Sequence, residues 1–369
     1  MLNPFIISGY ENEELFCDRK NETEKLLNAI ENRRNLTLFS LRRMGKTGLI
    51  KHLFYKIELK KIALPIYCDI MSTTNLTEFV TVFARAVFSK LAKKQSLLKS
   101  MLTNLASLRP SLSFDSLTGN PEISIKIERS DEAISTIETI FNYLAQQKEH
   151  IVIAIDEFQQ IANYPEKNME AVLRSNIQNI NNVTFIFSGS RKHILSEIFT
   201  SPGRPFFSST EIMEIDTIDK DSYAQFIVQQ LLKGKKHIDN GAIEYIGKVT
   251  HWHTYYVQYL CNKLYGSGYK NISISEIETV YQQILADTET VYVNYLNFIS
   301  NHQFRLLRAI AVDPEPKALT SKEFIRNHNL GASSSISTAI KSLEDKDLIF
   351  RQDRKEHTSE LQSLAYLVC

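Results

Sequence analysis

The sequence predicts an α/β protein whose buried sheet is followed by a helical region and a small C-terminal domain. Short apolar runs, rich in β-branched residues, recur through the first 215 residues, and each has the length of one buried strand. Between them lie segments with apolar residues at helical spacing. This alternation is typical of a parallel sheet covered by helices on both faces. The strands are expected at residues 36–39, 64–68, 151–155, 183–187 and 212–215.

The composition is that of a globular protein with balanced charge. Of the 369 residues, 43% are hydrophobic and 23% are charged, and 43 Lys and Arg face 42 Asp and Glu. This balance argues against a positively charged surface that extends over the whole protein and binds nucleic acid or a membrane. The four cysteines are widely spaced, so neither a metal cluster nor a disulfide framework is expected. This cysteine pattern fits a reduced, cytoplasmic compartment. We expect no membrane partner, because no apolar run has the length of a bilayer.

One stretch between the second and third expected strands breaks the alternation. Residues 111–117 and 122–128 alternate apolar and polar side chains around the turn-forming Gly119, Asn120 and Pro121. This pattern predicts a β-hairpin inserted into the α/β part. Two roles stay open for it: a surface elaboration, or a flap that contacts a partner or a second protomer.

Two later changes of pattern divide the rest of the chain. From about residue 219 the apolar spacing is helical only. After about residue 300 the expected order is helix, helix, turn, helix and strand, which is typical of a winged helix. We therefore expect three domains: an α/β core at residues 1–217, a helical region at 218–297 and a winged-helix-like domain at 298–369.

The loop after the first expected strand carries Gly45, Lys46 and Thr47 and leads into an apolar-periodic helix. Backbone N–H groups at a helix N-terminus bind anionic phosphate well, and glycine lets the backbone approach it closely. Lys46 would reach the β- and γ-phosphates of ATP, and the Thr47 hydroxyl would be a ligand of Mg²⁺. Ser40 stands where the usual GxxxxGK[ST] pattern has its first glycine. The strand–loop–helix setting favours a phosphate loop over a chance tripeptide.

Polar residues also follow the third and fourth expected strands. The run IVIAIDE ends in Asp156, which would steady Mg²⁺, and Glu157, which could act as the base toward a water aimed at the γ-phosphate. The next strand ends in Ser188-Gly189-Ser190, followed by Arg191. A serine hydroxyl there could touch the attacking water or the γ-phosphate, and an ordinary strand-to-loop turn is the alternative.

Six segments resemble the motifs of the archaeal-type ATPases, a family of AAA+/STAND P-loop proteins that also occurs in bacteria. They are SLRRMGKTGL (40–49, like PRRxGKTSL), FCDRKNE (16–22, like F.DRExE), IDEFQ (155–159, like hDEhQ), SGS (188–190, like the sensor strand), PGR (202–204, like P..GR) and THWHTYYVQYLC (250–261, like GGHPYYxQxLC of the helical lid). The resemblance covers nearly the whole chain.

This resemblance implies a P-loop NTPase αβα sandwich with a parallel sheet in the order 5-1-4-3-2, a helical lid at 218–297 and a C-terminal winged helix. It implies ATP as the ligand, with the FCDRKNE segment against the adenine. The implied nucleotide contacts are Arg43, Met44, Gly45, Lys46, Thr47, Gly48, Asp18, Arg19 and Ser188. The sequence departs from the family where Trp252 and Thr254 replace a Gly and a Pro of the lid motif, and where 357–369 lacks a DPxFRxW-like end.

The roles of the arginines are left as alternatives. By the resemblance, Arg204 is a candidate sensor or arginine finger that would act in catalysis beside Lys46 and Glu157. A salt bridge within a loop is the alternative for it. Arg42 and Arg43 could bind phosphate or point toward a neighbouring subunit.

Three functions follow from these patterns. The first is a Mg²⁺-dependent ATPase that hydrolyses ATP to ADP and phosphate. The second is a nucleotide-gated switch with little turnover. The third is an ATP-regulated DNA-binding protein, for which the charge is weak: residues 300–369 hold ten Lys and Arg against nine Asp and Glu, and Lys341 is the one base of the expected readout helix. A protein partner or self-association is therefore favoured over DNA.

Overall fold

The computed structural model describes residues 2–92, 111–114, 121–124, 127, 130–313, 318–346, 348–353 and 359–363. The chain divides into two compact units, Met1–Lys270 and Asn271–Cys369. The division into three domains, expected from the sequence, stays a prediction. None of the described helices is both long enough and apolar enough to cross a membrane.

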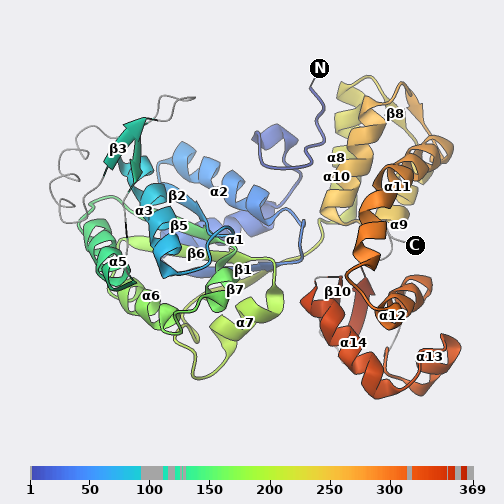
Figure 1. The fold of residues 1–369 in the computed structure, drawn as a ribbon. Helices are drawn as coiled ribbons and strands as arrows, with labels where there is room; N and C mark the ends of the chain where they lie inside the picture. The colour runs from blue at the N-terminus through green and yellow to red at the C-terminus, as the bar shows by residue number, and fades with distance from the viewer. Residues whose placement is uncertain are drawn as a thin grey trace. The chain divides into compact units, whose positions relative to one another are not determined.

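A five-stranded sheet forms the centre of the first unit (Figure 1). All four strand pairings are parallel. The spatial order is β2 (Leu64–Asp69), β5 (Ile151–Asp156), β6 (Val183–Gly189), β1 (Leu36–Ser40) and β7 (Glu211–Ile215). Numbered along the chain and read from β7, these strands have the order 5-1-4-3-2, which confirms the prediction. The polar residues that follow β1, β5 and β6 therefore meet at one edge of the sheet, because parallel strands end on the same side.

Helices cover both faces of this sheet, as predicted. Alternate residues of a strand point to opposite faces. Accordingly, Ile153 and Ile155 of β5 lie in the larger apolar cluster, whereas Val152 and Ala154 lie in the smaller one. The larger cluster includes α3 (Leu76–Ala92), α5 (Ser130–Ala145), α6 (Met169–Ile177) and α7 (Lys192–Thr200), and the smaller one includes α1 (Lys20–Glu31) and α2 (Lys46–Lys60).

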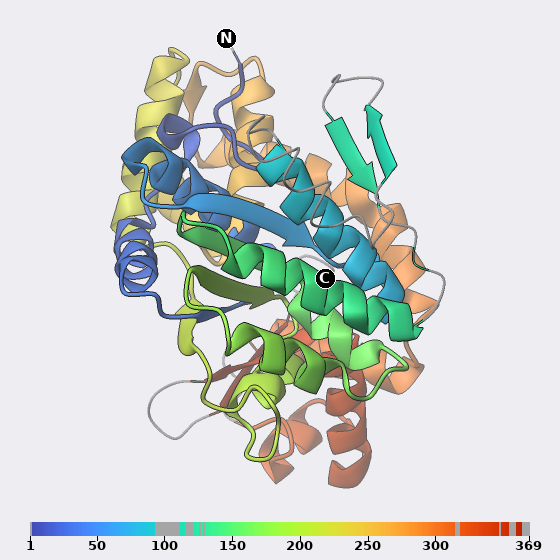
Figure 2. The ribbon, with the colours of Figure 1, turned by 90° about the vertical axis from the view of Figure 1, so that its left-hand side faces the viewer.

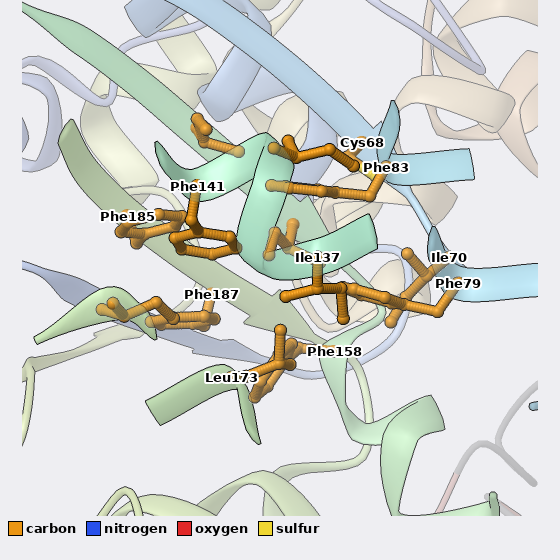
Figure 3. Packing of buried hydrophobic residues seen from close by; sticks show 14 of the residues in the cluster. Cys68, Ile70, Phe79, Phe83, Ile137, Phe141, Phe158, Leu173, Phe185 and Phe187 are labelled. Atoms are coloured by element: carbon orange, nitrogen blue, oxygen red, sulfur yellow. The ribbon is translucent and has the colours of Figure 1, made fainter. Parts of the chain in front are cut away.

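Aromatic rings fill the larger cluster and fix the ends of the central strands (Figure 3). The rings of Phe141 and Phe185 stack at a centroid distance of 5.9 Å. Phe158 is fully buried, and its ring centroid lies 4.5 Å from that of Phe187 on β6. Because Phe158 directly follows Glu157, this contact fixes the backbone just beyond the end of β5. The short 3-10 helix η3 (Phe158–Asn163) begins there.

The predicted hairpin is confirmed in the described residues. Strands β3 (Ser111–Phe114) and β4 (Pro121–Ser124) pair antiparallel, with Leu112 opposite Ile123. Figure 2 shows this pair beside α3, while α5 runs along α3 in front of the sheet. The rest of the predicted hairpin, at 115–120 and 125–128, lies outside the described residues apart from Ile127. Whether the hairpin is a flap stays a prediction.

Three helices complete the first unit, and we call them the lid helices: α8 (Lys220–Lys233), α9 (Asn240–Thr250) and α10 (Thr254–Gly266). Aspartates cap the first two, because Asp219 accepts from the backbone N–H of Ser222 and Asp239 accepts from that of Ala242. The chain's N-terminal segment packs on them, and the Phe5 ring makes an edge contact with that of Phe226. Strand β8 (His237–Ile238) is two residues long.

The second unit has the element order expected of a winged helix. Helices α12 and α14 supply most of its apolar core, and α12 begins with a capping box between Ser300 and Gln303. Strands β10 and β11 pair antiparallel, and β11 was not predicted from the sequence. The elements are β9 (Asn271–Ile272), α11 (Ile274–Leu296), α12 (Asn301–Val312), α13 (Lys322–Asn327), α14 (Ser333–Asp345), β10 (Ile349–Asp353) and β11 (Ser359–Ser363).

Candidate functional site

The loop between β1 and α2 turns sharply into the helix. Arg43 has φ 65° and Gly45 has φ 89°, so both lie in the left-handed region, where a residue without a Cβ is least strained. Helix α2 begins at Lys46, directly after Gly45. The first N–H groups of an α-helix have no partner within the helix, so this turn presents donors and the positive end of the helix dipole.

Lys46 joins this loop to the carboxylates at the end of β5. Its ammonium Nζ lies 3.2 Å from Asp156 Oδ1 and 3.3 Å from Glu157 Oε1. The side chains of Lys46 and Asp156 are only 6% and 3% exposed. The structure therefore brings together one buried cation and two anions that the sequence analysis singled out 110 residues apart.

Three hydroxyl groups surround the Asp156 carboxylate. Ser188 Oγ donates to Oδ1 at 2.6 Å, while Thr47 Oγ1 and Tyr67 Oη donate to Oδ2 at 2.9 and 2.7 Å. Burial alone raises the pKa of Asp156, but the Lys46 ammonium and the three hydroxyls outweigh it and lower that pKa below its usual value. Asp156 is therefore ionised at neutral pH.

The sequence analysis missed Tyr67. The register of β2 against β5 sets Asp69 opposite Asp156, so Tyr67 lies two residues before this end of the sheet. A hydroxyl near the end of an otherwise apolar strand was the only signal in the sequence. It was too weak to separate Tyr67 from an ordinary core tyrosine.

Glu157 has its own pair of donors. Its Oε2 accepts from Ser190 Oγ at 3.0 Å and from Gln159 Nε2. The backbone of Glu157 is left-handed, with φ 57°. This conformation turns the chain out of β5 and into η3, so the two neighbouring acids point to different partners.

The segment before α1 contacts the loop through Arg19, which is 4% exposed. Its guanidinium donates to the Met44 carbonyl at 3.2 Å and pairs with Glu22 at 2.7 Å. Asp18 and Arg19 both have left-handed backbones. Close by, a Cβ added at Gly48 would lie 3.6 Å from the Phe16 ring, so this segment also packs on the first turn of α2.

The lid helices touch the loop at the start of α10. The Arg43 guanidinium lies 4.3 Å from the centroid of the Tyr255 ring, within cation–π distance. His253 Nε2 lies 3.2 Å from the Arg42 carbonyl, which can only accept, so this nitrogen carries the proton. Burial lowers the pKa of His253 to about 4, so its ring is neutral at neutral pH and the other ring nitrogen, Nδ1, is unprotonated. A Cβ at Gly45 would lie 3.6 Å from Thr254 Cγ2.

Arg204 pairs with acidic side chains of α6 and α7. Its guanidinium lies 2.9 Å from Glu170 Oε1 and 3.8 Å from Glu197 Oε1. This is the loop salt bridge that the sequence analysis held as the alternative to a sensor or finger. Within one chain, the structure does not pair Arg204 with Asp156 or Glu157, and its catalytic role stays a prediction.

Comparison with known proteins agrees with this geometry. The family model described as "ATPase domain predominantly from Archaea" matches residues 16–240, and the model described as "Probable winged helix domain" matches residues 290–358. No curated protein matches the chain in sequence.

Several solved structures share the fold. The Walker-type ATPase of Pyrococcus abyssi is 16% identical with a TM-score of 0.67, and the match covers 99% of each chain. The ORC2 protein of Aeropyrum pernix in its ADPNP-ADP complexes is 12% identical with a TM-score of 0.57, over 98% of this chain and 93% of that one. Drosophila ORC bound to DNA is 12% identical with a TM-score of 0.51, over 98% and 87%. The model of the ATPase domain predominantly from Archaea matches residues 16–240, which is more than half of the sequence. The chain therefore belongs to this family of P-loop ATPase domains.

Proposed function

We propose that this chain binds ATP with Mg²⁺ at Lys46, Thr47 and Asp156 and hydrolyses it to ADP and phosphate. One observation carries the proposal. The buried Lys46 ammonium lies at the N-terminus of α2, within 3.3 Å of two carboxylates. A polyphosphate would replace these carboxylates as its partner and would also accept from the first N–H groups of the helix. The chain belongs to a family of ATPase domains, and this membership also supports nucleotide binding.

The residues at this position fit Mg²⁺. The Thr47 hydroxyl and the ionised Asp156 carboxylate are hard oxygen donors, which Mg²⁺ prefers. Among the described residues no group of three or more His, Cys, Asp or Glu could hold a metal alone. That agrees with an ion that takes one or two protein ligands and completes its shell with phosphate and water. When bound, Mg²⁺ supplies positive charge at the β- and γ-phosphate oxygens.

Glu157 is the base in this proposal. Once phosphate draws Lys46 away, Glu157 Oε1 loses its ion pair and can accept a proton from water. The water oxygen then bonds to the γ-phosphorus while the bond from that phosphorus to the bridging oxygen breaks, and ADP leaves. A positioned base contributes about 10²–10⁴-fold to such a step.

The remaining contacts are proposed around the same loop. Arg43, Met44, Gly45 and Gly48 would line the phosphates through the loop backbone. Ser188 would stay on Asp156, and Asp18 and Arg19 would border the adenine, since Arg19 holds the Met44 carbonyl. Arg204 is paired with Glu170 and Glu197. It would have to leave these partners to contact a nucleotide, as an arginine finger that reaches the nucleotide of a second protomer would.

Equilibrium binding of a fluorescent ATP analogue and steady-state phosphate release test this function. Lys46→Ala should abolish binding, whereas Glu157→Gln should bind ATP with Mg²⁺ and stop turnover. Lys90→Ala, which breaks an exposed ion pair with Glu58, is the matched control and should leave both measurements at wild-type values. Unchanged binding in Lys46→Ala refutes the proposed site.

A nucleotide-gated switch with little turnover is the second candidate function. The contacts of Tyr255 and His253 with the loop favour it, because phosphate bound at Gly45 would lie next to residues that contact the lid helices. Wild-type protein that binds ATP tightly but releases no phosphate would establish the switch and remove the ATPase.

The partner proposed for the second unit is a protein or a second copy of this chain. Within α14, Lys341 is outnumbered by Glu344 and Asp345, so this helix would repel DNA phosphates. A salt-dependent mobility shift with duplex DNA would overturn this proposal.

A further inference from the structure

The tripeptide Ser188-Gly189-Ser190 serves the two acids separately. Ser188 Oγ donates to Asp156, and Ser190 Oγ donates to Glu157. Between them, Gly189 leaves room for another donor. A Cβ there would lie 1.8 Å from Gln159 Oε1 and 3.2 Å from Leu195 Cδ1. Any side chain at position 189 would therefore displace the Gln159 amide.

The orientation of that amide is set by Glu157. Gln159 is 3% exposed, and its Nε2 donates to Glu157 Oε2. Its Oε1 is buried and accepts no hydrogen bond among the described residues. Turning the amide over would set its carbonyl oxygen against a carboxylate oxygen, and both atoms only accept. A buried polar atom without a partner is unfavourable, so its presence calls for an explanation. The hydrogen bond from the same amide to Glu157 supplies one.

We propose that Gln159 and Ser190 are positioning residues for Glu157 in ATP hydrolysis. This inference rests on the proposed function. Both donors hold Oε2, so Oε1, which now faces Lys46, is the oxygen left to take the proton of the attacking water. With Lys46 engaged by phosphate, these two donors are the side-chain partners, among the described residues, that still hold the Glu157 carboxylate. Gly189 is required because it makes the space for one of them.

The test compares variants that differ only in these donors. Gln159→Met keeps the length of the side chain and removes the donor, and kcat should fall about 10- to 100-fold. Equilibrium affinity for ATP with Mg²⁺ should stay at the wild-type value, because the described hydrogen bonds of both donors go to Glu157 and not to the phosphate loop. Ser190→Ala should lower kcat in the same way, and Ser190→Thr, which keeps a hydroxyl, should recover it. Ser190 is partly exposed, so this pair folds even if Gln159→Met does not.

Gln160→Met is the matched control. The side chain of the neighbouring Gln160 donates to the Thr73 carbonyl and makes no described hydrogen bond to the Glu157 carboxylate. Its backbone N–H donates to the Glu157 carbonyl, and the substitution keeps that bond, so the variant should turn over as wild type does. Equal kcat for wild type, Gln159→Met and Ser190→Ala overturns the inference and leaves the proposed function standing. Loss of ATP affinity in parallel with kcat overturns it too, since positioning of the base acts on turnover. Absence of turnover in the wild type overturns both.

Discussion

Replacing Lys46 by Met should destabilise the nucleotide-free protein, because it leaves Asp156 charged and buried without its cation. The Asp156 side chain is 3% exposed, and removing one partner of a buried ion pair costs about 3–5 kcal/mol. Three hydroxyls and the Glu157 backbone N–H still donate to Asp156. The loss should therefore be near the lower end of that range, about 3 kcal/mol.

The pH dependence gives this prediction its sign. In the wild type the pKa of Asp156 is lower in the folded protein than in the unfolded chain. Its ionised form therefore contributes stability above the unfolded pKa, and that contribution is lost as pH falls through the folded pKa. Without Lys46 the largest lowering influence is gone and burial raises the Asp156 pKa. The difference between wild type and variant should be largest near neutral pH and should shrink toward about pH 4, the ordinary range of an Asp carboxyl.

Urea unfolding followed by Trp fluorescence measures this difference. Trp252 is the only tryptophan of the chain and lies in the first unit, so its signal reports on the unit that holds the site. Lys90→Met serves as the control: it breaks an ion pair whose side chains are 30% and 52% exposed, and should cost about 0–1 kcal/mol. A Lys46→Met loss no larger than the control's, or one that does not shrink in acid, refutes the reasoning.

Three further predictions concern the surroundings of the site. Gly189→Ala puts a Cβ 1.8 Å from a buried amide oxygen and should destabilise by about 1–3 kcal/mol in urea unfolding; Gly266→Ala, whose Cβ meets nothing within 4 Å, is the control. Tyr67→Phe removes one donor from ionised Asp156 and should cost about 1.5–3 kcal/mol, with ATP turnover needing more Mg²⁺ in a titration. Arg43→Gln breaks the cation–π contact with the lid and should cost about 0.5–2 kcal/mol, checked by thermal unfolding.

The sequence predicted the positions of the strands better than it predicted which strands and side chains are neighbours. The five core strands were visible because each is a short apolar run, and their observed bounds differ from the expected ones by about two residues at most. Their spatial order came from family resemblance, since apolar periodicity says which residues are buried but not which strands are neighbours.

The side-chain partners of the site depended on that order. Lys46 stands out in the sequence because it belongs to Gly-Lys-Thr in a loop between a strand and a helix, and Asp156 and Glu157 stand out because they end an apolar run. Tyr67 could not be found, because its hydroxyl reaches Asp156 only once β2 and β5 pair in a particular register. The role of Gln159 was equally invisible, because it depends on the absence of a side chain at position 189 of another strand.

The departure of the lid from its family motif leads to one more prediction. Thr254 stands where the motif has proline, at the first residue of α10. Proline suits this position, because the first helical residue donates no hydrogen bond within the helix. The preceding residue, His253, has φ −67° and ψ 122°, which a following proline allows. Thr254 Oγ1 is buried and has no partner among the described residues.

Thr254→Pro should therefore stabilise the first unit. Fixing the backbone of the unfolded chain contributes about 0.4–1 kcal/mol, and removing an unsatisfied buried hydroxyl adds to this gain. The carbonyl that accepts from Tyr223 at 3.1 Å is kept in proline. Thr254→Val, which loses only the hydroxyl, separates the two contributions in the same unfolding assay. A Thr254→Pro variant less stable than wild type would mean that the Thr254 N–H or its packing against Gly45 is needed, and that the lid has diverged from its family to suit a different contact with the loop.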